Sequence, residues 1–177
     1  IEIKKQTLLT YQELLEENVL LDKTTAVYQR AHIYPAIAIY RTYMDFAYGS
    51  EEIEKIMEQA MYSSVKSTGE FFAKVGSYHF FFSIFKKICF LSTKFSYKLP
   101  YFEMEWIESE RDVIAWNCHK CFYHDEFQRY GCPNLTKIFC KLDDVMYGNI
   151  PVAHWERTKT IGEGEEICDF RFVQSKI

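Results

Sequence analysis

The thiol side chains of the C-terminal third are the residues best suited to chemistry. Four of the six cysteines, Cys118, Cys121, Cys132 and Cys140, lie within 23 residues, and Cys168 follows them. Histidines and carboxylates are interleaved with them. Thiolates, imidazoles and carboxylates together can provide a nucleophile, a metal site or polar contacts to a ligand. Which of these the cysteines provide decides the function.

The spacing Cys118-x2-Cys121, with His119 and His124 nearby, is similar to that of zinc sites. A structural zinc, however, needs a second pair of ligands and usually a glycine-containing turn. Here Cys118 is expected on a strand and Cys121 at the start of a helix. We therefore assign no metal ligands and require no cofactor, and zinc is kept as a minor alternative.

Three other thiols have more informative positions. Cys140 and Asp143 are three residues apart on a predicted helix, so they share one face of it. Cys121 is expected at a helix N-terminus, where the helix dipole favours the thiolate. Cys168 and Phe170 share one face of a predicted strand. Each of these residues also has a structural alternative, because free cysteines are most often packed thiols and Asp143 could simply face solvent.

The first hundred residues are patterned as helices. Apolar spacing predicts helices over residues 7–21, 24–48, 50–75 and 77–91. Thr10 and Glu13 resemble a capping box, and Pro35 predicts a kink or break in the second helix. The aromatic residues of the last segment predict a helix that is buried on most of its circumference.

From Pro100 onward the pattern predicts strands and helices in turn. Alternation predicts hairpins from residues 101–108 with 113–116 and from 153–161 with 167–173, with helices over 121–131 and 134–147 between them. The predicted class is α+β: N-terminal helices packed with a small antiparallel sheet built from two hairpins and an intervening helix pair. We expect a single domain over 1–177, with a mainly helical part (1–99) and an α+β part (100–177).

Composition narrows the function classes. The net charge is −4 and the lysines are scattered, which argues against nucleic-acid binding. The longest apolar run is interrupted by Ser83, Lys86 and Lys87, so no membrane span is expected. A chain of 177 residues can bury a sufficient core without disulfides, so we interpret the six cysteines as reduced thiols of a cytoplasmic protein. The sequence does not indicate an oligomeric state.

Several motifs in this order resemble the L-2-amino-thiazoline-4-carboxylic acid hydrolase family. They are Trp116 to Cys121, Gly131-Cys132-Pro133-Asn134-Leu135, Cys140-x2-Asp143, Arg157-Thr158-Lys159-Thr160-Ile161-x-Glu163-Gly164 and Cys168-Asp169-Phe170-Arg171-Phe172. The resemblance is strong across residues 100 to 173 and weak in the helical part. Several motifs in the right order are more specific than any one of them.

The resemblance implies a hydrolase that acts on a small-molecule substrate. In such a reaction, water opens a sulfur-containing cyclic amidine and gives a carbamoyl cysteine. The implied catalytic residues are Cys121, Cys140, Asp143 and Cys168. The implied substrate-binding residues are Arg157, Thr158, Thr160 and Asp169. Cys118, His119 and Cys132 have no counterpart in this pattern and are expected to be incidental.

A second interpretation stays open. The closing Glu163-Gly164 segment and the Cys-x-Phe strand are also similar to the small-molecule-binding 4-vinyl reductase domains. The chain would then be a non-catalytic sensor whose cysteines line a pocket or bind a metal.

Overall fold

The computed structural model describes residues 2–17, 23–78 and 80–175, which form two compact units. The first unit consists of residues 1–61 and 123–138, and the second of residues 62–122 and 139–177. The predicted α+β class is confirmed. All four strands belong to the second unit, as do all of the predicted site residues.

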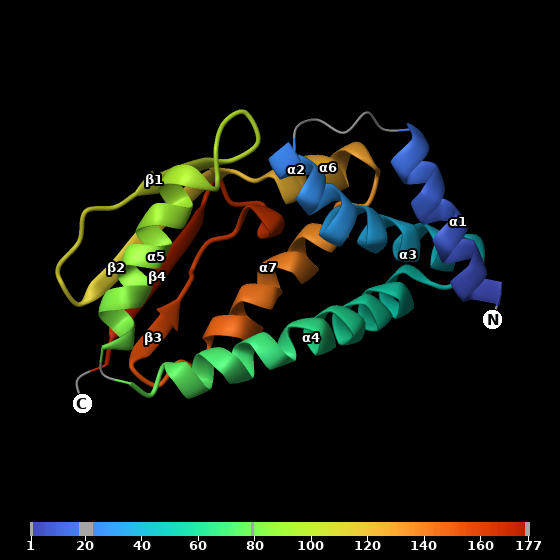
Figure 1. The fold of residues 1–177 in the computed structure, drawn as a ribbon. Coiled ribbons are helices and arrows are strands. Elements are labelled where there is room, and N and C mark those ends of the chain that lie inside the picture. The colour runs from blue at the N-terminus through green and yellow to red at the C-terminus, as the bar shows by residue number, and fades with distance from the viewer. Residues whose placement is uncertain (1, 18–22, 79, 176–177) are drawn as a thin grey trace. The chain divides into compact units, whose positions relative to one another are not determined.

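The first unit is helical. Its elements are α1 (Glu2–Glu17), α2 (Lys23–Tyr28), the π-helical turn η1 (Gln29–Ile33), α3 (Tyr34–Asp45), the beginning of α4 (Ser50–Val75), most of α6 (Phe122–Arg129) and the first turn of α7 (Asn134–Tyr147) (Figure 1). Its core includes the buried side chains of Leu14, Ile37, Met57 and Phe127. The buried Gln29 and Glu126 side chains hydrogen-bond at 3.1 Å.

Helix α1 begins earlier than predicted. It starts at Glu2, so the predicted capping box is wrong, and the buried Thr10 lies in the middle of the helix. No glycine or proline precedes Thr10, and the side chains from Glu2 to Leu9 allow the helix to extend backwards. Residues 18–21 of the predicted helix lie outside the described residues, as does residue 79 of the fourth one.

Pro35 does not break its helix. The helical path continues from Lys23 to Asp45, and Pro35 is the second residue of α3, directly after a turn in which the Tyr34 N–H donates to the Gln29 carbonyl oxygen. The irregularity instead takes the form of η1, the π-helical turn that ends at Ile33. The prediction missed this alternative because a π turn has no simple sequence signature.

The second unit is built on one antiparallel sheet. Its strands are β1 (Glu103–Trp106), β2 (Val113–Lys120), β3 (Ala153–Glu156) and β4 (Cys168–Gln174), in the order β1-β2-β4-β3. Both predicted hairpins are present, and the pairing of β2 with β4 joins them into one sheet. Strand β2 runs four residues beyond its predicted end. The prediction of strand through residue 161 is wrong, because β3 ends at Glu156 and the 3-10 helix η2 (Ile161–Glu163) lies in the connection to β4.

Helix α5 (Phe81–Phe95) covers one face of this sheet (Figure 1). The core cluster beneath it combines Phe82, Phe85 and Cys89 of the helix with Ile114 and Phe172 of the sheet. The Phe85 and Phe172 rings meet edge to face at 5.0 Å. The expectation that this helix is buried on most of its circumference is wrong: it begins and ends later than predicted, and one face stays exposed.

Gly69 marks a close approach between α4 and α7 within the second unit. A Cβ atom at this position would lie 2.7 Å from the carbonyl oxygen of Val145. Only glycine therefore allows the two helix backbones to come this near. Among the described residues, no helix is long and apolar enough to cross a membrane.

Candidate functional site

Four of the six thiols meet at the end of the sheet in the second unit. Cys118 on β2 is the direct partner of Cys168 on β4, because the two residues face each other in the antiparallel register. The Cys118 thiol also contacts Cys121, and the Cys140 thiol of α7 contacts Cys168. Cys118 and Cys168 are buried, whereas Cys121 and Cys140 are partly exposed. Cys132 belongs to the first unit.

The contacts within this cluster lower the pKa of one thiol and raise the pKa of two others. Contacts with the Cys118 and Cys140 thiols hold the pKa of Cys168 well below its ordinary value, and the backbone N–H of Ile161 donates to its sulfur at 3.2 Å. The Cys118 thiol also donates to the Lys120 carbonyl oxygen at 3.1 Å. The contact with Cys121 and the contact with Cys168 raise the pKa of Cys118, and the contact with Cys168 raises that of Cys140. The arrangement favours a thiolate on Cys168 next to two protonated thiols.

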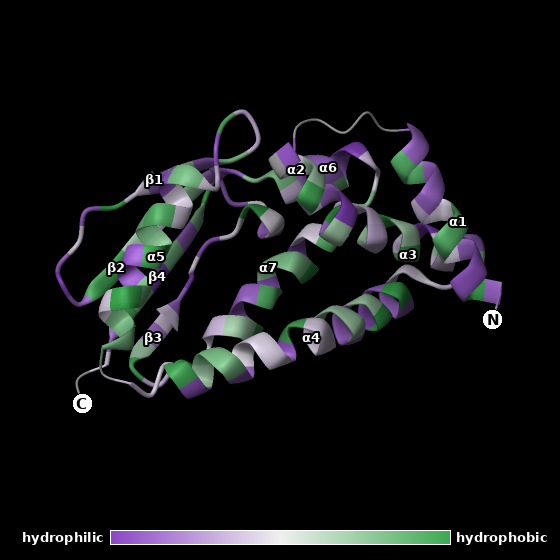
Figure 2. Ribbon diagram, viewed as in Figure 1, coloured by the Kyte–Doolittle hydropathy of each residue, from purple (hydrophilic) through white to green (hydrophobic). Residues whose placement is uncertain are grey.

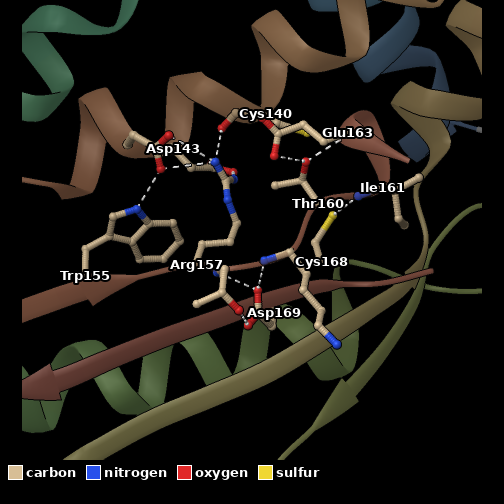
Figure 3. A network of polar contacts seen from close by, with 12 residues as sticks. Cys140, Asp143, Trp155, Arg157, Thr160, Ile161, Glu163, Cys168 and Asp169 are labelled. Atoms are coloured by element: carbon tan, nitrogen blue, oxygen red, sulfur yellow. Dashed lines mark hydrogen bonds and ion pairs between the residues drawn. The ribbon is translucent and has the colours of Figure 1, made fainter. Parts of the chain in front are cut away.

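The 3-10 helix η2 supplies the Ile161 donor. Its N-cap is Thr160, whose Oγ1 accepts from the Glu163 backbone N–H at 3.2 Å, and it ends at Gly164 with φ 96°. The Thr160 hydroxyl in turn donates to Glu163 Oε2 at 3.3 Å. This reciprocal cap fixes the backbone that points the Ile161 N–H at the Cys168 sulfur (Figure 3).

Arg157 ties the connection after β3 to helix α7. Its guanidinium donates to Asp143 Oδ2 at 2.9 Å, to the Cys140 carbonyl oxygen at 2.8 Å and to Asp144 Oδ1 at 3.0 Å (Figure 3). It also lies over the rings of Trp155 and Phe170, 5.6 and 5.8 Å from their centroids. Only 4% of the side chain is exposed, so this arginine is a buried clamp on the turn that carries Cys140.

The two carboxylates on α7 have different environments. Burial raises the pKa of Asp143 to about 7, although the Arg157 guanidinium acts in the opposite direction. The Asp143 side chain still exposes 27% of its surface, against 51% for Asp144. Asp144 also accepts from the indole N–H of Trp155 at 2.8 Å. Asp143 can therefore gain or lose a proton near neutral pH, and it lies three residues from Cys140.

Asp169 holds the same connection from the strand side. Its carboxylate accepts from the backbone N–H groups of Thr158 and Lys159 at 2.9 and 2.6 Å and from the Thr158 hydroxyl at 2.7 Å. Burial opposes ionisation, but these hydrogen bonds together lower the pKa of Asp169. The carboxylate thus fixes the backbone that precedes Thr160 and η2.

The hydrogen bonds of the Asp169 carboxylate predict that the folded protein loses stability in acid. Because the folded pKa of Asp169 lies below that of the unfolded chain, about 3.9, its contribution to stability is present above pH 4 and is lost as the pH falls further. We expect Asp169→Asn to lower the free energy of unfolding by about 1 kcal/mol at pH 7, because solvent screens these partly exposed bonds. The difference between wild type and variant, measured by urea denaturation from pH 7 to pH 3, should shrink with acidification. A constant difference would contradict the role of the charge.

The structure thus brings together all four residues predicted as catalytic, Cys121, Cys140, Asp143 and Cys168, as neighbours in one cluster. The four predicted substrate-binding residues surround it, and each already makes hydrogen bonds within the protein: Arg157, Thr158, Thr160 and Asp169. Their predicted roles toward a substrate stay predictions.

Two features of the site were missed. Cys118, expected to be incidental, is in contact with both Cys121 and Cys168. Its signal lay in the pairing of the two cysteine-bearing strands, which a single sequence does not reveal. The turn that positions Ile161 had a visible signal, since Thr160-x-x-Glu163 followed by glycine is typical of a capped helical turn.

Other parts of the described chain offer weaker sites. Within residues 2–17, 23–78 and 80–175, no group of three or more histidine, cysteine or acidic side chains has an arrangement that could hold a metal ion. An open depression in the first unit is lined by consecutive or nearby residues at the start of α4, Gly49 to Glu52 and Lys55. It contains none of the predicted site residues, so the thiol cluster is the better candidate.

Comparison with known proteins agrees with the motifs on which the resemblance was based. No curated protein and no solved structure matches the chain. The family described as L-2-amino-thiazoline-4-carboxylic acid hydrolase matches residues 7–172, which covers both units and the whole thiol cluster. With nearly its entire length matched, the chain belongs to the L-2-amino-thiazoline-4-carboxylic acid hydrolase family.

Proposed function

We propose that the protein hydrolyses a small cyclic amidine such as L-2-amino-thiazoline-4-carboxylate to a carbamoyl cysteine, and that the thiol cluster is its reactive centre. The observation that carries the proposal is the convergence of Cys118, Cys121, Cys140 and Cys168 in a chain of this family. The carbon between the ring sulfur and the ring nitrogen is electrophilic, and a thiolate is suited to attack it.

Cys168 is the proposed nucleophile. Its sulfur attacks the amidine carbon, the bond from that carbon to the ring sulfur breaks, and the departing sulfur takes the proton of Cys140. This step leaves an isothiourea on Cys168, a thiolate on Cys140 and a free thiol on the opened substrate. The low pKa of Cys168 and the proton held by Cys140 support this division of roles.

Water completes the reaction. It adds to the isothiourea carbon, which places one of its protons on the former ring nitrogen. As the Cys168 thiolate leaves, the remaining hydroxyl proton passes to Cys140 and the carbamoyl carbonyl forms. The sum is one substrate and one water converted to one carbamoyl cysteine, with both cysteines returned to their initial states.

The remaining site residues are proposed to bind the substrate or to hold Cys168 and Cys140 in position. Asp143 is proposed to bind the amino group of the amidine, because a partly exposed carboxylate beside Cys140 can accept its N–H groups. Cys118, which contacts both Cys121 and Cys168, is proposed to hold the Cys168 sulfur in position together with Cys121. Arg157 and Thr160 act as positioning residues, and Thr158 and Asp169 fix the connection between them. The six free thiols support a cytoplasmic location.

Incubation of the purified protein with L-2-amino-thiazoline-4-carboxylate tests the proposal. We expect stoichiometric appearance of a carbamoyl cysteine, identified by mass spectrometry, and of one new thiol per turnover, counted with a chromogenic disulfide. Cys132→Ala is the matched control, because Cys132 is a buried thiol of the other unit. Absence of turnover in a folded protein that still binds the compound would support the sensor interpretation instead.

A further inference from the structure

Helix α5 has a second apolar face that the sheet does not use. Its inward face is formed by Phe82, Phe85, Cys89 and Thr93, which are buried. Between them, on the outside, large apolar side chains are each about half exposed and form what we call the outer stripe: Ile84, Ile88, Leu91 and Phe95. Figure 2 shows that α5 is hydrophobic over most of its length.

The outer stripe is large enough to be a contact surface. Phe80 and Leu99, 52% and 68% exposed, extend the apolar surface beyond the two ends of the helix. The exposed surface of these six side chains adds up to roughly 600 Å² per chain, so a dimer that covered all of it would bury roughly 1,200 Å², the lower end of stable protein interfaces. Isolated exposed apolar residues need no explanation, but a contiguous patch of this size does.

The spacing of the outer stripe fits a second copy of the same helix. Its steps of four, three and four residues are those of a coiled-coil seam. When two α5 helices lie antiparallel about a two-fold axis between residues 89 and 90, Ile84 meets Phe95 and Ile88 meets Leu91. The same patch then serves both partners, as an isologous contact requires.

Lysines border the outer stripe on one side only. Lys87 and Lys94 are exposed along one flank, and Lys94 Nζ lies 5.4 Å from the centroid of the Phe90 ring. Lys86 is two residues from both Ile84 and Ile88, so it lies on the side of the helix away from the stripe, where it donates to the Glu110 carbonyl oxygen at 2.7 Å. The spacing and the exposed area of the outer stripe, rather than these charges, indicate a second copy as the partner.

We propose that the outer stripe of α5 forms the interface of an antiparallel homodimer. Sedimentation velocity of the full chain at 1–100 µM, a range chosen because interfaces near 1,200 Å² are often of micromolar affinity, should show a dimer that dissociates on dilution. Leu91→Glu should be monomeric at all these concentrations. Phe71→Glu is the control, because Phe71 on α4 is as exposed as the stripe residues but lies outside the stripe, and it should remain dimeric.

A mixing experiment tests the register. Ile88→Glu and Leu91→Lys should each be monomeric alone, and their equimolar mixture should dimerise, because position 88 of one chain faces position 91 of the other. Circular dichroism verifies that each variant is folded. A monomeric wild type, a dimer unaffected by Leu91→Glu, a mixture that stays monomeric, or a monomer that instead co-sediments with anionic vesicles would each overturn the proposal.

Discussion

Replacing Cys168 by serine is expected to lower kcat/KM for the thiazoline acid by roughly 10³-fold or more, the usual cost of removing a covalent nucleophile. A serine hydroxyl stays protonated where the cysteine sulfur is a thiolate. It can still accept the Ile161 N–H, so the variant should fold, and a thermal unfolding transition within a few degrees of wild type verifies this.

The nucleophile assignment also has a direct chemical readout. Acid quenching of the wild-type reaction in its first turnovers should trap an isothiourea on the protein. Peptide mapping by mass spectrometry should find the mass of the bound substrate on the peptide that contains Cys168, and Cys168→Ser should show none. Cys89→Ser is a control that keeps both turnover and adduct, because Cys89 is a buried thiol on the inward face of α5. An adduct on Cys121 or Cys140, or full activity in Cys168→Ser, would contradict the assignment.

Cys140→Ala should have a different signature. If Cys140 only supplies the proton for the departing sulfur, the adduct on Cys168 still forms, but more slowly. The pKa of Cys168 should also rise, because one of its two thiol contacts is lost.

Local pattern was sufficient to predict the two hairpins of the second unit and the break between α6 and α7. Alternation identified both hairpins, and Gly131-Cys132-Pro133 separated α6 from α7 as expected. The boundaries failed where local signals competed. The residues after Glu156 alternate like a strand, but the Thr160 cap and Asp169 draw them into a turn. The outcome depends on Asp169, eleven positions after Thr158, and the periodicity of the sequence gives no information about a contact over that separation.

The candidate site was only partly accessible to the sequence, for a similar reason. Cys140 and Asp143 share a helix face, so their proximity follows from spacing. The meeting of Cys118 with Cys168 depends on which strands pair and in which register, and both are properties of the whole sheet.

The exposed face of α5 was missed because a helix that is apolar all round is normally buried. The proposed homodimer would account for that composition.

The second large effect concerns Arg157. Arg157→Lys keeps the charge but cannot bridge Asp143, Asp144 and the Cys140 carbonyl oxygen at once, since an ammonium lacks the planar fork of donors. We expect the free energy of unfolding to fall by about 2–3 kcal/mol, less than for a fully buried pair because Asp143 is partly exposed. Urea denaturation at pH 7 measures this. Arg171→Lys is the control: Arg171 bonds the Trp116 carbonyl and Asn117 but does not contact α7 through any hydrogen bond found among the described residues.

Steady-state kinetics of Arg157→Lys separates two roles for this arginine. If the guanidinium binds the substrate carboxylate, as the family resemblance implied, the variant should raise KM and leave kcat nearly unchanged. If it positions Cys140 through the carbonyl contact, kcat should fall roughly 10- to 100-fold with little change in KM, because a displaced proton donor slows the chemical step. We expect the second result, since every contact of the guanidinium described above is already made within the protein. A pure KM effect would return Arg157 to the substrate-binding residues and require another group to hold Cys140.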